Sequence, residues 1–185
     1  PTRCRSMRVR SVWWQRPVGP CTNWGSLRQE RVDVNLEIDT VQTYVRHAMG
    51  QMVEVAERLG DDLLNERPVG DETNAVGALI VHCCELTNFW LAHVAGGQPT
   101  ERNRDAEFEQ VSTVAEVREM VERTLEATRG DLERIAIGDT DADPVLRQFL
   151  PGGDESDDSL VLHVIEELFQ HLGHMEITAD VLLAR

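Results

Sequence analysis

Apolar positions recur every three or four residues along four segments of this chain, which is the period of helices that pack in a bundle. The second of these segments is nearly apolar all round, which predicts that it is the most buried helix. The third opens with Thr113 and Glu116 spaced as a capping box. The four predicted helices cover residues 39–59, 74–94, 113–135 and 160–183. The pattern predicts an all-α fold, a four-helix bundle.

Two stretches of the chain lie outside this helical pattern. Residues 95–112 are polar, contain glycine and proline, and are longer than most connections between helices, so they permit a crossover along the bundle. Residues 1–32 hold seven arginines against one acidic residue and show neither helical nor strand period. We therefore expect residues 1–32 to form an irregular basic extension and residues 33–185 to form the bundle.

The predicted fourth helix places polar side chains that could bind a metal along one stripe. His163, Glu167 and His171 follow at spacings of four residues, and His174 comes three residues later. A solvated polar face would show the same spacing. However, His171 falls on the apolar seam, where a buried imidazole needs a hydrogen-bond acceptor or a metal. A carboxylate and an imidazole at positions i and i+4 suit zinc or a similar divalent ion, with a third ligand from elsewhere.

The predicted second helix contains a histidine at its middle, His82, which is a candidate for that third ligand. The alternative is a neutral core histidine bonded to a carbonyl group. Cys83 and Cys84 follow directly, but consecutive helical residues diverge by about 100° and cannot converge on one ion. We interpret both cysteines as small core residues.

The net charge of -15 argues against nucleic acid and anionic membranes as partners, because binding either depends on a basic surface. No apolar run approaches the roughly 20 residues that span a bilayer. The cysteines show no disulfide framework, which favours a reducing, cytoplasmic location. Bundles with helices this apolar are often homodimers, so a homodimer is compatible with the sequence.

Four helices, a histidine midway along the second and Glu-x-x-x-His in the fourth resemble the DinB-like superfamily, including its mycothiol-dependent maleylpyruvate isomerase and thiol S-transferase branches. The resemblance covers about residues 36–184 and rests on ALIVHCCELTNFWL and HVIEELFQHLGHMEITADVLL. It implies an up-down-down-up bundle in which His82, Glu167 and His171 bind one divalent metal, with zinc preferred over nickel, iron or manganese. His174 stands where the family often has glutamine, either as a fourth ligand or as a neighbour of the ligands. The isomerase branch has a further C-terminal domain, and this chain stops at Arg185, so maleylpyruvate isomerisation is not expected.

Two imidazoles and one carboxylate leave an open metal position, as catalytic zinc sites do. Such a site would activate mycothiol or a similar small thiol as a thiolate, and the expected activity is thiol S-transfer to an electrophile. A non-catalytic bundle whose metal only joins two helices, acting as a binding or stress-response module, is the alternative. Metal-dependent hydrolysis is a third hypothesis, in which His174 or His163 would be the base.

Overall fold

The computed structural model describes residues 36–138, 144–150, 153 and 155–185 of the 185-residue chain. The basic extension predicted for residues 1–32 lies outside the described residues, so its boundary with the bundle stays a prediction. Residues from Asn35 to Arg185 belong to one compact unit. All further statements concern this unit.

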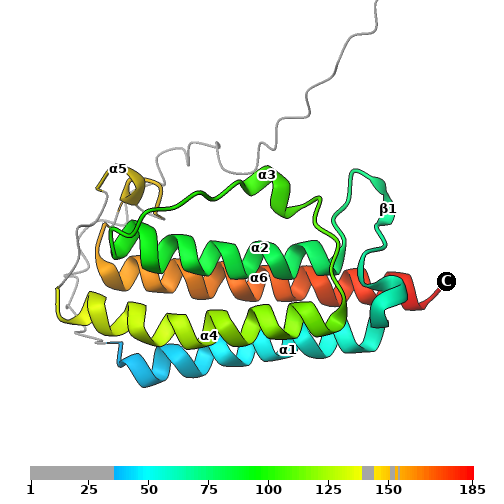
Figure 1. Ribbon diagram of the computed structural model, residues 1–185, viewed down its shortest axis with the longest axis horizontal. Helices are drawn as coiled ribbons and strands as arrows, with labels where there is room; N and C mark the ends of the chain where they lie inside the picture. Colours follow the sequence, from blue (N-terminus) through cyan, green and yellow to red (C-terminus); the bar gives the residue numbers. More distant parts are fainter. Residues whose placement is uncertain (1–35, 139–143, 151–152, 154) are drawn as a thin grey trace, which may run out of the picture. The chain divides into compact units, whose positions relative to one another are not determined.

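Long helices make up the unit, which confirms the all-α fold (Figure 1). Helix α2 continues directly into a π-helical segment, η1, so that the two together correspond to the predicted second helix. The long elements are α1 (Ile38–Leu64), α2 (Val76–Asn88), η1 (Phe89–Ala95), α4 (Val114–Ala136) and α6 (Asp157–Leu183). The short ones are β1 (Pro68–Asp71), α3 (Arg104–Glu107) and α5 (Pro144–Arg147).

The helices follow the up-down-down-up order that the family resemblance implies. Helix α1 packs against α4 and α6, and α2 packs against the same two, so α1 and α2 lie at diagonal corners of the bundle. Helices α2 and α4 run in the same direction, and the chain between them returns along the bundle past α3 (Figure 1). We call residues 96–113 the crossing segment. A parallel pair of helices requires such a long connection.

The core forms along the predicted apolar seams. In α6 every seam position except His171 is buried, namely Val161, Val164, Leu168, Met175, Thr178 and Leu182. Helix α2 is buried on nearly all sides, as its composition predicts. Within the described residues, Val76–Ala95 is the one segment long and apolar enough to cross a membrane, which corrects the prediction that no apolar run approaches that length. However, 67% of it is buried inside the protein, as in a core helix.

Two helices depart from the sequence prediction. Helix α1 does not end at Gly60 but continues to Leu64 through a kink, where Gly60 has φ 63° and ψ 175°. Because this left-handed backbone region strains residues that carry a Cβ atom, glycine suits the kink. In η1 the backbone widens to a π-helix, and its end is closed by a bond from Gly96 N to Leu91 O. Such π-helical turns frequently occur at functional sites.

Candidate metal centre

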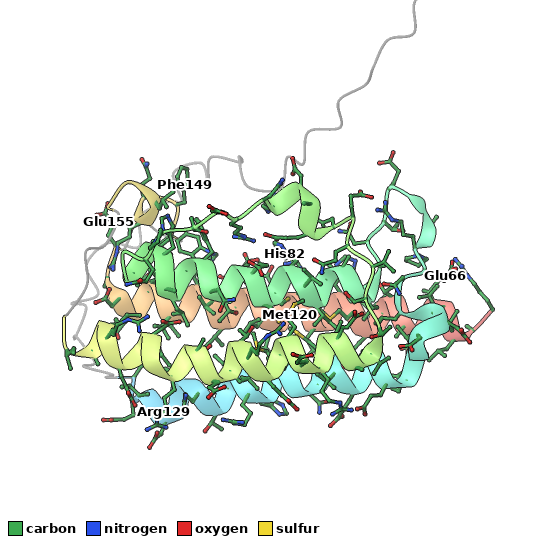
Figure 2. All side chains as sticks on the ribbon, in the orientation of Figure 1. Glu66, His82, Met120, Arg129, Phe149 and Glu155 are labelled. Carbon is green, nitrogen blue, oxygen red and sulfur yellow. The ribbon has the colours of Figure 1, made fainter. Side chains whose placement is uncertain are left out.

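His82 lies in the middle of α2, on the side that faces α3, with only 2% of its surface exposed (Figure 2). Its Nδ1 atom is 2.7 Å from Oε2 of Glu107, and its ring packs at 4.7 Å, centroid to centroid, against Phe108. Burial lowers the pKa of His82 from 6.5 to about 4, although the hydrogen bond with Glu107 acts in the opposite direction. His82 is therefore a neutral imidazole at pH 7. Its partner is a carboxylate, not the carbonyl of a simple core histidine.

Glu107 and Arg102 are the residues of this site that the sequence prediction missed. Glu107 is 5% exposed, and the Arg102 guanidinium donates to both of its oxygens, from Nε to Oε1 at 2.6 Å and from Nη2 to Oε2 at 3.0 Å. Both residues lie in the crossing segment, which looked like a polar loop. One local signal existed, because Asn103 caps a short helical turn there and Phe108 follows it.

Glu167 and His171 lie one turn apart on α6, and Nε2 of His171 is 3.5 Å from Oε2 of Glu167. Their side chains are 13% and 21% exposed, so both lie at the edge of the core. The contact with His171 lowers the pKa of Glu167, and the nearby rings of His163 and His82 add to this effect, while partial burial opposes it. Glu167 is therefore an anion at neutral pH.

The structure brings the three predicted ligands together. The ring centroids of His82 and His171 are 4.9 Å apart and nearly perpendicular, and Glu167 lies beside His171. The fourth candidate, His174, is exposed, and in the described part of the chain no hydrogen bond or ring contact joins it to these three. As the side chains stand, no group of three or more His, Cys, Asp or Glu residues in that part of the chain has the geometry of a metal site.

The donor atoms nevertheless match the chemistry of a divalent metal. Glu107 bonds to Nδ1 of His82, and among the described residues Nε2 of His82 has no hydrogen-bond partner. Imidazole nitrogen and carboxylate oxygen are both common zinc ligands. The donor set therefore fits a zinc-type ion, with two imidazoles and one carboxylate contributed by α2 and α6.

His163 lies one turn before Glu167 and is also buried, with 8% exposure. Its ring meets Trp90 edge-on at 4.9 Å, and its Nδ1 atom has no hydrogen-bond partner among the described residues. The nearest carboxylate oxygen, on Glu166, is 3.7 Å away, which is too long for a hydrogen bond. His163 is thus a buried imidazole beside the site with an unused polar atom.

Cys83 and Cys84 are buried core residues, as the sequence predicted. Burial raises the pKa of the Cys84 thiol to about 12 and that of Cys83 well above its usual value of 9.0. Both thiols therefore stay protonated at pH 7. Neither has the thiolate character of a nucleophile or a metal ligand.

Comparison with known proteins gives one match. The family model described as mycothiol-S-transferase matches residues 40–182, which run from the first turn of α1 to the last turn of α6 and include the three predicted ligands. No curated protein and no solved structure matches the chain. Because the matched region covers most of the sequence and the bundle has the topology implied by the resemblance, the chain belongs to the mycothiol-S-transferase family, a DinB-like family.

Proposed function

We propose that this protein transfers a small thiol of the mycothiol type to an electrophilic substrate, using one divalent metal held by His82, Glu167 and His171. The observation that supports it most is the meeting of α2 and α6 side chains, with 4.9 Å between the ring centroids of His82 and His171 and Glu167 beside them. Family membership supports a small-molecule thiol as the substrate.

The three side chains differ in their freedom to move. His82 is held by Glu107 and by the ring of Phe108, and it is almost fully buried. Glu167 and His171 are partly exposed and contact each other at 3.5 Å. We therefore expect the α6 pair to turn toward a fixed His82 when an ion binds. This movement would complete the metal site, which the three side chains do not form as they stand.

A zinc-type ion, when bound, would lower the pKa of a thiol at its open position, so that the thiol would be a thiolate at neutral pH. The protein residues supply the surroundings. Phe108 and Trp90 border the site with apolar surface, which limits the access of water. His82 stays neutral at pH 7 because of its burial, so one of its ring nitrogens has a lone pair that can bind the ion. Glu167 contributes a negative charge that offsets the charge of a cation.

The test combines metal analysis with thiol turnover in the full chain, purified without chelator. We expect one equivalent of divalent metal, and consumption of mycothiol with a haloaromatic electrophile that exceeds the rate without protein. His82→Ala should lose both metal and turnover, whereas His47→Ala, which changes an exposed histidine on α1, should keep both. A His82→Ala variant with full turnover would refute this site.

A non-catalytic bundle joined by a metal is the second candidate. It is favoured by the open arrangement of the three side chains, which form no complete metal site as they stand. Bound metal without turnover of mycothiol or of a panel of other thiols would select this candidate. A cytosolic location and a homodimeric state stay predictions, to be checked by fractionation and by light scattering.

A further inference from the structure

The crossing segment places a carboxylate inside the protein that belongs to none of the predicted metal ligands. Glu107 is 5% exposed, yet it lies in a short helix of a connection between α2 and α4. A buried carboxylate is stable only when charge and hydrogen bonds compensate its lost hydration. Glu107 has three such donors, two from Arg102 and one from His82.

These contacts determine which nitrogen of His82 carries the proton. An ionised carboxylate only accepts hydrogen bonds, so at 2.7 Å from Glu107 Oε2 the Nδ1 atom of His82 must donate. The Arg102 Nη2 atom lies 3.5 Å from the same Nδ1, which is the upper limit of a hydrogen bond and much longer than its 3.0 Å bond to Glu107. The lone pair of the ring is therefore at Nε2.

The contacts also fix the plane of the ring. Phe108, the residue after Glu107, packs on His82 with an interplanar angle of 31°. Arg102 is held in turn by the face of Phe89, 5.0 Å from its guanidinium carbon. Two neighbouring residues of the crossing segment thus hold His82. Glu107 bonds to the Nδ1 edge of its ring, and Phe108 packs on the face of its ring. His82 has little freedom to rotate.

We propose that Glu107 is a positioning residue, which holds His82 as the Nδ1-protonated tautomer with Nε2 free for the metal, and that Arg102 keeps the Glu107 carboxylate in place. This proposal rests on the metal site of the proposed function. Metal-binding histidines commonly donate their second ring N–H to a carboxylate, which orients the ring and raises its basicity. Here the carboxylate comes from the connection that the topology requires, and not from the bundle helices.

A purely structural explanation exists, in which Glu107 and Arg102 only tie the crossing segment to α2. Both explanations predict a loss of stability when the carboxylate is removed. They differ in two other quantities, the tautomer of His82 and the affinity for metal at constant fold. The experiments therefore measure these two.

The first experiment records the ¹⁵N shifts of the histidine rings in the metal-free full chain at pH 7.5. We expect a protonated Nδ1 and an unprotonated Nε2 for His82 in the parent protein and in the control Glu109→Gln. Glu109 is a suitable control because it is 76% exposed and only two residues away. In Glu107→Gln the preference for one tautomer should weaken. A parent protein with the proton on Nε2 would overturn the proposal without any metal present.

The second experiment measures the affinity for Zn²⁺ and Co²⁺ by competition with a chelator. Glu107→Gln should bind about 10 to 100 times more weakly at unchanged stoichiometry, the loss typical of such outer partners, while Glu109→Gln should match the parent. An altered Co²⁺ absorption spectrum in Glu107→Gln alone would support a changed position of His82.

The outcomes distinguish a failure of the positioning role from a failure of the proposed function. A folded Glu107→Gln that binds metal within twofold of the parent overturns the positioning role alone. A parent that binds no metal overturns the proposed function and the positioning role together. If Glu107→Gln does not fold, the tautomer of the parent still tests the proposal, because a proton on Nε2 overturns it.

Discussion

The half of the bundle formed by α1 and α4 differs from the half formed by α2 and α6 in the partners of its buried polar groups. Every buried residue of α1 is apolar. In α4 the buried Thr128 hydroxyl donates within its own helix, to Thr124 O, and the buried Asp131 pairs with Arg134 three residues on. In the other half the buried Thr87 hydroxyl also bonds within its own helix, to Cys83 O, but the buried His82 bonds to a different element.

The contacts around His82 show this difference. The His82–Glu107 bond spans 25 residues, and the ring of His82 also meets that of His171 on a third element. Burying such groups costs free energy, and well-packed apolar residues of similar size are often as stable or more so. The α1–α4 half thus has the polar pattern of a structural core, whereas the buried polar groups around His82 are those that the proposed metal site would require.

The strongest test of this contrast removes ligands from the α2–α6 half. His82→Ala and His171→Ala should each weaken Zn²⁺ binding by more than about 100-fold, beyond the cost of losing an outer partner. The measurement is a chelator competition, with His47→Ala on α1 as control. If His82→Ala binds like the parent while His174→Ala does not, the ligand pair is His171 and His174, and His82 is not a ligand.

Acid should destabilise the metal-free protein through His82. Its pKa is about 4 in the folded state and 6.5 in the unfolded chain, so the unfolded state binds more protons between these values. The free energy of unfolding should therefore fall as the pH drops from about 6.5 to 4, by up to roughly 3 kcal/mol from this group. Denaturant unfolding with chelator present measures it. His82→Gln should show a smaller pH slope, and equal slopes would contradict the prediction.

Metal should connect the two elements that contribute ligands. An ion bound only by the folded state adds about 2.7 kcal/mol at one hundred times its dissociation constant, so a chelator should lower the melting temperature at pH 7.5. The increment should fade toward pH 5, because histidine must be neutral to bind. No difference between loaded and metal-free protein at pH 7.5, in a sample with one equivalent of metal, would show that α2 and α6 do not share an ion.

The α1–α4 half should respond only in stability. Thr113 Oγ1 accepts a bond from Glu116 N at 3.2 Å, and Glu116 Oε2 accepts one from Thr113 N at 2.7 Å. Thr113→Ala should cost about 1 kcal/mol of unfolding free energy, since it removes the cap of α4. Metal affinity should not change. A loss of affinity in this variant would weaken the division into two halves.

The smallest effect is expected at Arg129, on the outer side of α4 (Figure 2). Its ion pairs with Glu133 and Asp39, at 2.9 and 3.4 Å, are at least half exposed. Exposed pairs of this kind contribute about 0 to 1 kcal/mol, so Arg129→Ala should change the unfolding free energy by about 0.5 kcal/mol or less. Thermal unfolding of parent and variant decides it, and a change above 1 kcal/mol would mean that this surface has a further role.

The fold could be predicted because its signals are local. The α6 seam recurs at helical spacing from Val161 to Leu182, and its positions are buried except for His171. The capping box of Thr113 and Glu116 is found as predicted. The three candidate ligands also meet, since each lies mid-helix on a core-facing stripe. The length of the connection at residues 95–112 indicated a crossover along the bundle, and the family resemblance implied the order of the helices.

The role of the crossing segment could not be predicted from sequence. Glu107 and Arg102 lie among polar residues, and nothing in RNRDAEFEQ says which carboxylate is buried. That depends on the path of the connection across α2, which is a property of the packed bundle. The kink at Gly60 and the π-helix η1 were missed for a related reason. Glycine is common where helices end, and π-helical turns have no simple sequence pattern.

The crossing segment has a consequence for the motions of the protein. Its far end is tied to α1, because the Asn65 side chain bonds both the N–H and the C=O of Ser112 at 3.0 and 2.9 Å. Its middle is held to α2 by Glu107. A connection fixed at two points should open as one cooperative unit in hydrogen exchange, unlike a free loop. Opening would release His82 at the same moment, so amide protection of residues 102–112 should report whether His82 is held in place.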